Sequence, residues 1–157
     1  MNDEPRKMAL AFWRRAKEFA DAANLVAEAA GTRVSLPAYY LWGHSIELSF
    51  KVFLIGHDIP PKELKSRDLG HNLTSLLKKA QSLGIEKTIH LYPQDIGVIT
   101  VLNQDYAEKK FEYGESDDFT LPFIHLTKRT AERLVLFLNP DRKGKLQKQH
   151  SSEKITL

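Results

Sequence analysis

The sequence predicts an all-α protein, an antiparallel four-helix bundle with one additional short helix. Three observations predict this fold class. Apolar residues recur at helical spacing in five segments, these segments carry helix start and stop signals, and no segment of useful length alternates as a strand would. The stretch "TIHLY" has strand-like composition but is too short to outweigh the five helical patterns. A chain of 157 residues fits a single domain.

The first predicted helix covers residues 8–30. Asp3 and Glu4 precede it, where carboxylates interact favourably with the positive end of a helix. Gly31 follows it, and glycine commonly ends a helix in the left-handed conformation. Alanine is frequent along this segment, so we expect close packing against a neighbouring helix.

The second predicted helix covers residues 36–55, "LPAYYLWGHSIELSFKVFLI", and is apolar on nearly every face. Ser35 is a suitable N-cap, and Pro37 lies in the first turn, where a missing N–H costs nothing. Gly56 ends the helix. A helix that is apolar all round is expected to be buried, either at the centre of the bundle or against a second subunit.

A connector and a short third helix come next. The connector, "HDIPPKELKSRDLG", contains a Pro-Pro break and a single predicted turn at 62–65. The third helix covers "NLTSLLKKAQSL", residues 72–83, and ends at Gly84.

Two more helices complete the prediction. The fourth follows Pro93 and covers residues 95–109, and the polar stretch "EYGESDDFT" after it is predicted to be a loop. Thr120 is predicted to cap the fifth helix, which begins at Leu121-Pro122 and ends before Asn139-Pro140.

Residues 1–138 form the predicted helical domain, and residues 139–157 form a basic tail. The formal net charge is +3, and the tail alone holds five basic residues against two acidic ones, so the body is formally neutral. The tail lacks apolar periodicity and is predicted to be disordered. We expect it to be either a solubilising terminus or the main source of any weak, salt-sensitive RNA binding.

The composition also excludes several classes of protein. The chain has no cysteine, which excludes a disulfide framework, a thiolate zinc site and a cysteine nucleophile, and which is consistent with a reducing compartment. The first residues do not read as a signal peptide, and no segment approaches the roughly 18–20 apolar residues that span a bilayer. We expect a cytoplasmic protein with no membrane partner.

Four polar residues share one stripe of the second helix: Tyr40, His44, Glu47 and Lys51. Glu47 and Lys51 are spaced i, i+4 in the favourable order, and His44 precedes Glu47 by about one turn. Buried charges without partners cost several kcal/mol each, so we expect this stripe to be paired. It is either a structural network or, together with His71, a binding or catalytic cleft with His44 and Glu47 as acid–base candidates.

Three other candidates are less specific. His71 could instead cap the third helix. Lys110 and Tyr113, with Lys109, could form a phosphate-facing patch or an ordinary solvated helix end. No metal site is predicted, because His-x-x-Glu lacks the second histidine of zinc peptidases and no second such pair exists for a di-iron bundle. No cofactor is predicted, since the chain lacks a glycine-rich phosphate loop.

Several segments, taken in order, resemble the HEPN family of small all-α domains. "GHSIELSFKVFL" resembles the second helix of the family, and "GHNL" the start of the third. "LNQDYAEKKFEY" and "LPFIHLTKRTAERLVLF" resemble the last two helices, so the resemblance covers roughly residues 8–138. It implies a helical bundle, commonly a homodimer, that binds a nucleotide or RNA. It also implies a place in toxin–antitoxin or phage-defence systems, with a nucleotidyltransferase as a possible protein partner.

The resemblance implies a test for ribonuclease activity. Ribonuclease members carry an Arg and a His separated by four to six residues in the last helix. Here Arg129 and Arg133 are followed by no histidine in that helix, and His125 precedes them. Two other Arg–His pairs have the wrong spacing: Arg67 with His71, and Arg142 with His150. We therefore expect no RNA cleavage by this route.

Three functions stay open. The first is a non-catalytic HEPN-like module that binds a nucleotide, RNA or a protein partner. The second is an enzyme that acts on RNA or a nucleotide through His44 and Glu47. The third is an interaction protein whose buried charges only set the register of its helices. The missing Arg–His spacing favours binding, and the apolar second helix favours a homodimer.

Overall fold

The structure is a computed structural model that describes residues 3–142. Over this range the protein is all-α and contains no strand. The helices are α1 (Asp3–Ala30), α2 (Leu36–Ile55), α3 (Pro61–Leu64), α4 (Leu73–Ser82), the 3-10 turn η1 (Ile85–Lys87), α5 (Pro93–Tyr106), α6 (Lys110–Tyr113) and α7 (Ile124–Phe137). The predicted fold class is confirmed at this level. None of the described helices is long and apolar enough to cross a membrane.

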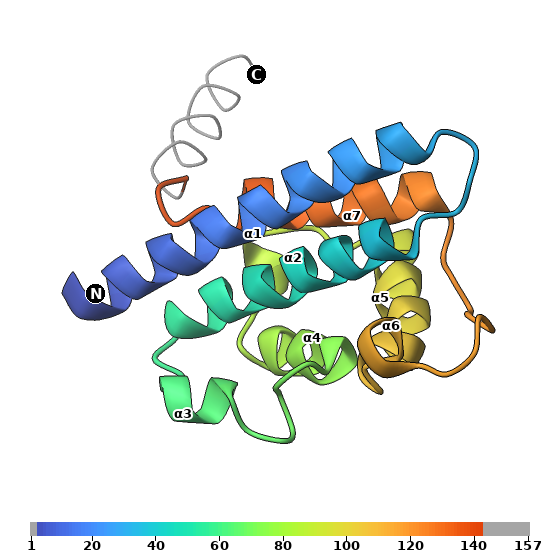
Figure 1. Cartoon of the computed structure of the whole chain (residues 1–157). Coiled ribbons are helices and arrows are strands. Elements are labelled where there is room, and N and C mark those ends of the chain that lie inside the picture. The colour runs from blue at the N-terminus through green and yellow to red at the C-terminus, as the bar shows by residue number, and fades with distance from the viewer. Residues whose placement is uncertain (1–2, 143–157) are drawn as a thin grey trace, which may run out of the picture.

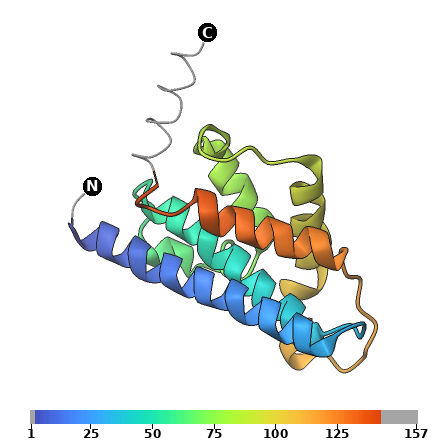
Figure 2. The same cartoon turned by 90° about the horizontal axis from the view of Figure 1, so that it is seen from above.

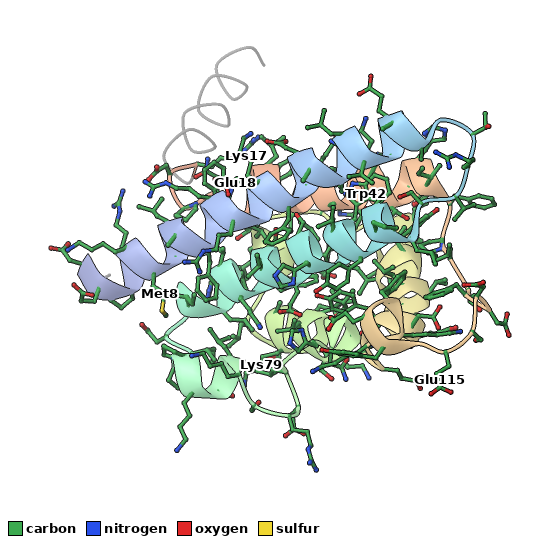
Figure 3. The ribbon with its side chains drawn as sticks, in the orientation of Figure 1. Met8, Lys17, Glu18, Trp42, Lys79 and Glu115 are labelled. Carbon is green, nitrogen blue, oxygen red and sulfur yellow. The ribbon has the colours of Figure 1, made fainter. Side chains whose placement is uncertain are left out.

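Helix α2 lies at the centre of the molecule. Figures 1 and 2 show α1 and α7 along one side of it, while α4, α5 and α6 lie on the other. Fifteen of its 20 residues are buried, which confirms that this helix is covered nearly all round. Trp42, at the α1 and α7 side (Figure 3), is fully buried, and its indole nitrogen donates to Asn24 at 3.0 Å. Helices of the same chain therefore cover α2, and its burial does not require a second subunit.

Small residues let α1 and α2 approach closely. Ala16 and Ala23 of α1 are fully buried, and the Ser45 hydroxyl donates to the Ala16 carbonyl at 2.7 Å. On its other side α1 contacts α7, where the Trp13 indole nitrogen donates to the Val135 carbonyl at 2.8 Å. The alanine-rich first helix thus packs as its composition predicts.

The region after α5 differs from the prediction. Helix α5 begins at Pro93 and ends at Tyr106, three residues earlier than predicted at its C-terminal end. Lys109 adopts the left-handed conformation (φ 55°), so the chain turns there and starts the short helix α6. That helix includes Glu112 and Tyr113, which were predicted to lie in a loop. A lysine in the left-handed region carries no sequence signal comparable to glycine, so this turn was not predictable.

The start of the last helix was also predicted too early. Helix α7 begins at Ile124, and Thr120 does not cap it. The Thr120 amide instead donates to the Asp105 carboxylate at 3.0 Å, and the Tyr39 hydroxyl donates to the Pro122 carbonyl at 2.8 Å. These long-range bonds hold residues 120–123 outside the helix.

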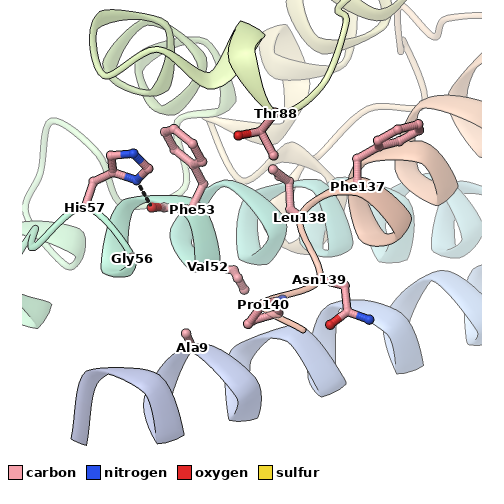
Figure 4. A pocket seen from close by; sticks show the side chains of 10 residues that line it. All are labelled: Ala9, Val52, Phe53, Gly56, His57, Thr88, Phe137, Leu138, Asn139 and Pro140. Carbon is pink, nitrogen blue, oxygen red and sulfur yellow. Dashed lines mark hydrogen bonds between the residues drawn. The ribbon is translucent and has the colours of Figure 1, made fainter. Parts of the chain in front are cut away.

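Residues 139–142, assigned to the tail from sequence, contact the body. Asp141 pairs with Arg6 at 3.0 Å, next to the start of α1. Leu138 to Pro140 line a small apolar pocket with Ala9 and Phe53, where His57 is bonded to the Phe53 carbonyl (Figure 4). Its volume is about 70 Å³. The predicted disorder of the rest of the tail concerns residues 143–157, which lie outside the described range.

Candidate functional site

The Glu47 carboxylate is the centre of a buried hydrogen-bond network. Glu47 is 1% exposed, yet both its oxygens are engaged. Oε2 accepts from the Lys51 ammonium at 2.9 Å, while Oε1 accepts from Nδ1 of His71 at 2.8 Å and from the Tyr106 hydroxyl at 2.9 Å. Tyr106 is in turn 3.2 Å from Nδ1 of His44. We call Glu47, Lys51, His71, Tyr106 and His44 the Glu47 network.

A glycine on α2 makes room for Tyr106. Gly43 lies one turn before Glu47, and a Cβ placed on it would come within 2.7 Å of the Tyr106 ring. Only glycine leaves room for this ring from α5 next to α2, where its hydroxyl donates to the Glu47 carboxylate. Gly43 was not singled out from sequence, because a glycine inside a helix has no distinctive pattern until its neighbour is known.

The connector before α4 supplies His71. Its backbone is in the left-handed region (φ 57°), which is uncommon for a residue with a side chain and is often found at functional sites. The next residue, Asn72, caps α4 by accepting from the Ser75 amide at 3.0 Å. His71 therefore does not cap that helix, and its ring reaches the Glu47 carboxylate instead.

The carboxylate fixes the direction of every hydrogen bond in the network. An ionised carboxylate can only accept, so Lys51, Tyr106 and Nδ1 of His71 must each donate to it. Since the Tyr106 proton is committed to Glu47, the Tyr106 oxygen accepts from Nδ1 of His44. Both histidines therefore carry a proton on Nδ1, and in the neutral ring Nε2 has a free lone pair.

Burial and charge set the protonation states. Burial raises the pKa of Glu47, but the Lys51 ammonium and its hydrogen bond, with His71 and His44, outweigh burial and leave the pKa below its usual value. Burial lowers the pKa of His44, although Glu47 acts in the opposite direction. Burial, followed by the adjacent Glu47, raises the pKa of Tyr106. Near neutral pH we therefore expect an ionised Glu47, a neutral His44 and a protonated Tyr106.

Five of the seven site residues expected from sequence come together. Besides the four in the Glu47 network, the Tyr40 ring stacks on His44 at 6.2 Å between centroids and lies 6.2 Å from Tyr106. The other two lie on the neighbouring helix α6, where Tyr113 interacts electrostatically with Tyr40. Lys110 faces the Asp105 carboxylate at 3.7 Å and the Phe119 ring at 4.6 Å, while Tyr113 is 76% exposed on α6.

The geometry changes the chemical role that the sequence suggested for Glu47. Three donors surround the carboxylate, so it orients other groups and is not itself positioned to exchange protons with a substrate. The His44 ring is half-buried, with Phe19 edge-on at 4.5 Å. Over residues 3–142 no three His, Asp or Glu side chains are arranged to hold a metal ion.

A second group of residues was missed from sequence. Three arginines alternate with two aromatic rings along α7, and we call them the Arg–aromatic strip: Tyr92, Arg129, Arg133, Phe137 and Arg142. The Tyr92 ring lies 5.6 Å from the Arg129 guanidinium and 4.8 Å from that of Arg133. The Phe137 ring lies 5.8 Å from Arg133 and 4.4 Å from Arg142. Contacts of this kind are cation–π interactions.

Asp95 anchors the middle of the strip. This carboxylate is 3% exposed and accepts from the Arg133 guanidinium, from the Thr130 hydroxyl at 2.8 Å and from the Tyr92 amide at 2.9 Å. Arg133 also donates to the His90 carbonyl at 2.7 Å. The strip thus holds three guanidinium groups against one buried carboxylate, a formal balance of +2.

Part of the strip has a sequence signal. Arg129, Arg133 and Phe137 recur every four residues and so lie on one side of α7. Tyr92 comes from another segment, and only the fold brings it to the arginines. The formal neutrality of the body concealed this local excess of charge.

No family model, no curated protein and no solved structure matches this chain. The functional conclusion therefore depends on the Glu47 network and the Arg–aromatic strip. The network has its charges paired inside the protein. In the strip, Arg129 and the Tyr92 ring are exposed, while the other three residues are half-buried.

Proposed function

We propose that this chain is a HEPN-like helical module that binds single-stranded RNA without cleaving it. The observation that carries the proposal is the Arg–aromatic strip on α7. Guanidinium groups bind phosphates, and aromatic rings stack on bases. Bases are available for stacking in single strands but not inside a duplex, which favours a single-stranded ligand.

Exposure makes Tyr92 the best stacking residue of the strip. Its side chain is 41% exposed, and the His90 ring supports it edge-on at 4.5 Å. Arg133 is held by Asp95, so it is a fixed part of the surface. Arg129 is exposed and, among the described residues, has no carboxylate partner. Arg129 is therefore the strip residue best able to contact a phosphate.

The C-terminal end of the strip is continuous with the basic tail. Asp141, the acidic neighbour of Arg142, pairs with Arg6. Beyond Arg142 the sequence continues with Lys143 and Lys145. The sequence alone placed RNA binding mainly in the tail, and the strip adds a site on the folded body from which such contacts can continue.

Two observations support binding over cleavage. The last helix lacks the Arg–His spacing of the ribonucleases that the sequence resembles. Glu47, one of the two acid–base candidates, has its oxygens occupied by three donors. By the same resemblance, we propose a role in a toxin–antitoxin or defence system with a nucleotidyltransferase as partner.

Fluorescence anisotropy with a labelled single-stranded RNA tests the proposal. An RNA of about 20 nucleotides is long enough to fill at least one binding site of the usual size. Tyr92→Ala should weaken binding by about 1–3 kcal/mol, the usual loss for one base-stacking ring. Arg129→Gln should weaken binding and reduce the slope of log K against log salt by about 0.7, as for one phosphate contact on a single strand.

Matched controls come from other surfaces. Tyr113→Ala removes a ring that is 76% exposed on α6, and Lys62→Gln removes an exposed cation on α3. Both should bind as the wild type does. If the two strip variants also bind as the wild type does, or if duplex RNA competes equally well, the strip is not the RNA site.

We also propose a homodimer, and the reason is now an apolar groove at the surface, since helices of the same chain already cover α2. An apolar groove of about 400 Å³ lies between α5 and the segment that leads into α7, and it is lined by Val98, Val101, Leu121, Phe123 and Leu126 among others. Phe123 beside it is 81% exposed.

Sedimentation of the wild-type protein tests this proposal and should show a dimer at protein concentrations on the order of tens of micromolar. Phe123→Ser should shift it to monomer, and a wild-type monomer would count against the proposal.

A further inference from the structure

In the Glu47 network, Nδ1 of His71 is bonded to the carboxylate, while Nε2 of the same ring bonds to no other described residue. Nδ1 of this ring points to a carboxylate whose side chain is 2% exposed, yet the His71 side chain is 44% exposed. Since Nδ1 is turned to the buried carboxylate, we expect the exposed part to include the opposite edge of the ring, which carries Nε2. Because Nδ1 holds the proton, Nε2 of the neutral ring presents a lone pair to solvent.

The other described histidines lack this combination. Nδ1 of His44 contacts the Tyr106 hydroxyl and Nδ1 of His57 contacts the Phe53 carbonyl, so neither ring is bonded to a carboxylate. His90 and His125 are exposed, but within residues 3–142 neither has a carboxylate partner. Among the described residues, His71 alone joins an exposed ring edge to a buried carboxylate.

We propose that His71 is a phosphoryl-accepting nucleophile and that its donor is a small acyl phosphate. In this step the Nε2 lone pair attacks phosphorus and an N–P bond forms. The bond between phosphorus and the bridging oxygen breaks, and the carboxylate leaves with the electron pair. The ring keeps its Nδ1 proton and becomes a cation, and the ionised Glu47 stabilises that charge as the carboxylate of a catalytic triad stabilises an imidazolium.

The donor class follows from what the site cannot supply. A phosphate ester of an alcohol needs a general acid to protonate its leaving oxygen. The Tyr106 proton is already donated to Glu47, and the Lys51 ammonium bonds to Oε2, the carboxylate oxygen that does not contact His71. An acyl phosphate needs no such acid, because its leaving carboxylate is stable as an anion.

The net charge of the segment that contains His71 suits an anionic donor. Residues 61–79, which contain His71, hold five basic residues against two acidic ones. Arg67, in the same connector, is exposed and has no ion-pair partner among residues 3–142. These cations can attract a phosphate to the exposed ring edge before reaction.

Acetyl phosphate is the probe. After incubation with the full chain, mass spectrometry should locate one phosphoryl group on His71, labile in acid and stable in alkali. His71 should react roughly tenfold faster than His90 or His125, a gain on the scale measured for a carboxylate behind a histidine. His71→Asn should abolish the modification, whereas the control His125→Asn should leave its rate unchanged.

Glu47→Gln tests the role of the carboxylate and should slow the reaction roughly tenfold. If this variant does not fold, long-range ¹H–¹⁵N spectra of the wild type give the same information, since they should show His71 protonated on Nδ1. The proposal is overturned if His71 gains no phosphoryl group, if it reacts no faster than His90 and His125, or if its neutral ring carries the proton on Nε2.

Discussion

The Glu47 network and the Arg–aromatic strip both pair cations with acceptors, but they end with opposite balances. In the network one buried carboxylate meets one ammonium, and hydrogen bonds occupy both of its oxygens. In the strip three guanidinium groups meet a single buried carboxylate, Asp95, and rings fill the spaces between them. The comparison teaches that a buried charge whose counter-charge also lies inside the protein is explained by the stability of the fold. In the strip the charge is not balanced, and this is the surface on which we propose that the RNA binds.

Removing the central carboxylate should have the largest effect on the fold. Glu47→Ala leaves the Lys51 ammonium buried without its partner, and we expect a loss of roughly 3–5 kcal/mol in the free energy of unfolding. Urea denaturation followed by circular dichroism measures this loss. Glu18→Ala, at an exposed position of α1, is the control and should cost less than about 0.5 kcal/mol.

A double substitution separates charge from packing in the same network. Glu47→Leu with Lys51→Met deletes both charges and keeps the volume, so it should recover part of the stability that Glu47→Ala loses. Recovery should be incomplete, because Tyr106 and His71 still lose their acceptor. If the double variant is less stable than Glu47→Ala, the buried-charge account of the network is wrong.

Two glycines inside helices should respond in opposite directions. At Gly43 a Cβ would come within 2.7 Å of the Tyr106 ring, so Gly43→Ala should cost about 1–3 kcal/mol by overpacking. At Gly97, in α5, a Cβ would meet no atom within 4 Å, so Gly97→Ala should stabilise by up to about 1 kcal/mol. Thermal melts of the two variants test this pair, and equal shifts would show that Tyr106 does not need the space above Gly43.

Acid should weaken the network through His44. In the folded protein the pKa of His44 lies below the ordinary value of 6.5, so the unfolded chain takes up the proton first as the pH falls. The contribution of His44 to the free energy of unfolding is therefore complete above pH 6.5 and is lost as the pH falls from 6.5 towards the lower folded pKa. The slope from one such group is at most about 1.4 kcal/mol per pH unit. Urea midpoints between about pH 7.5 and pH 5.5 should fall less steeply in His44→Gln than in the wild type. Identical slopes would mean that His44 does not carry this pH dependence.

Sequence reasoning was most successful where one segment contains the whole signal. The apolar surround of α2 predicted its burial, and the i, i+4 spacing of Glu47 and Lys51 predicted their pairing; both predictions are confirmed. The stripe was expected to need partners, and it has them. Which partners it has was only partly predictable, since His71 was proposed but Tyr106 was not.

The missed features depend on contacts between distant segments. Tyr106 reaches Glu47 only because α5 lies across Gly43, and Tyr92 joins the strip only because it packs next to Arg133. Thr120 has the residue type of a helix cap, but its bond to Asp105 places it outside α7. A local pattern does not contain these tertiary contacts, and they decide the sites and the helix ends.

The affinity for single-stranded RNA, measured in parallel for two double variants, tests the central claim most directly. Glu47→Leu with Lys51→Met alters the network, and Tyr92→Ala with Arg129→Gln alters the strip. We expect the first variant, once shown to be folded, to bind within about twofold of the wild type. The second should bind at least roughly tenfold more weakly, a change of about 1.4 kcal/mol. If the network variant loses RNA binding while the strip variant keeps it, the roles assigned to these two regions are reversed and the account is wrong.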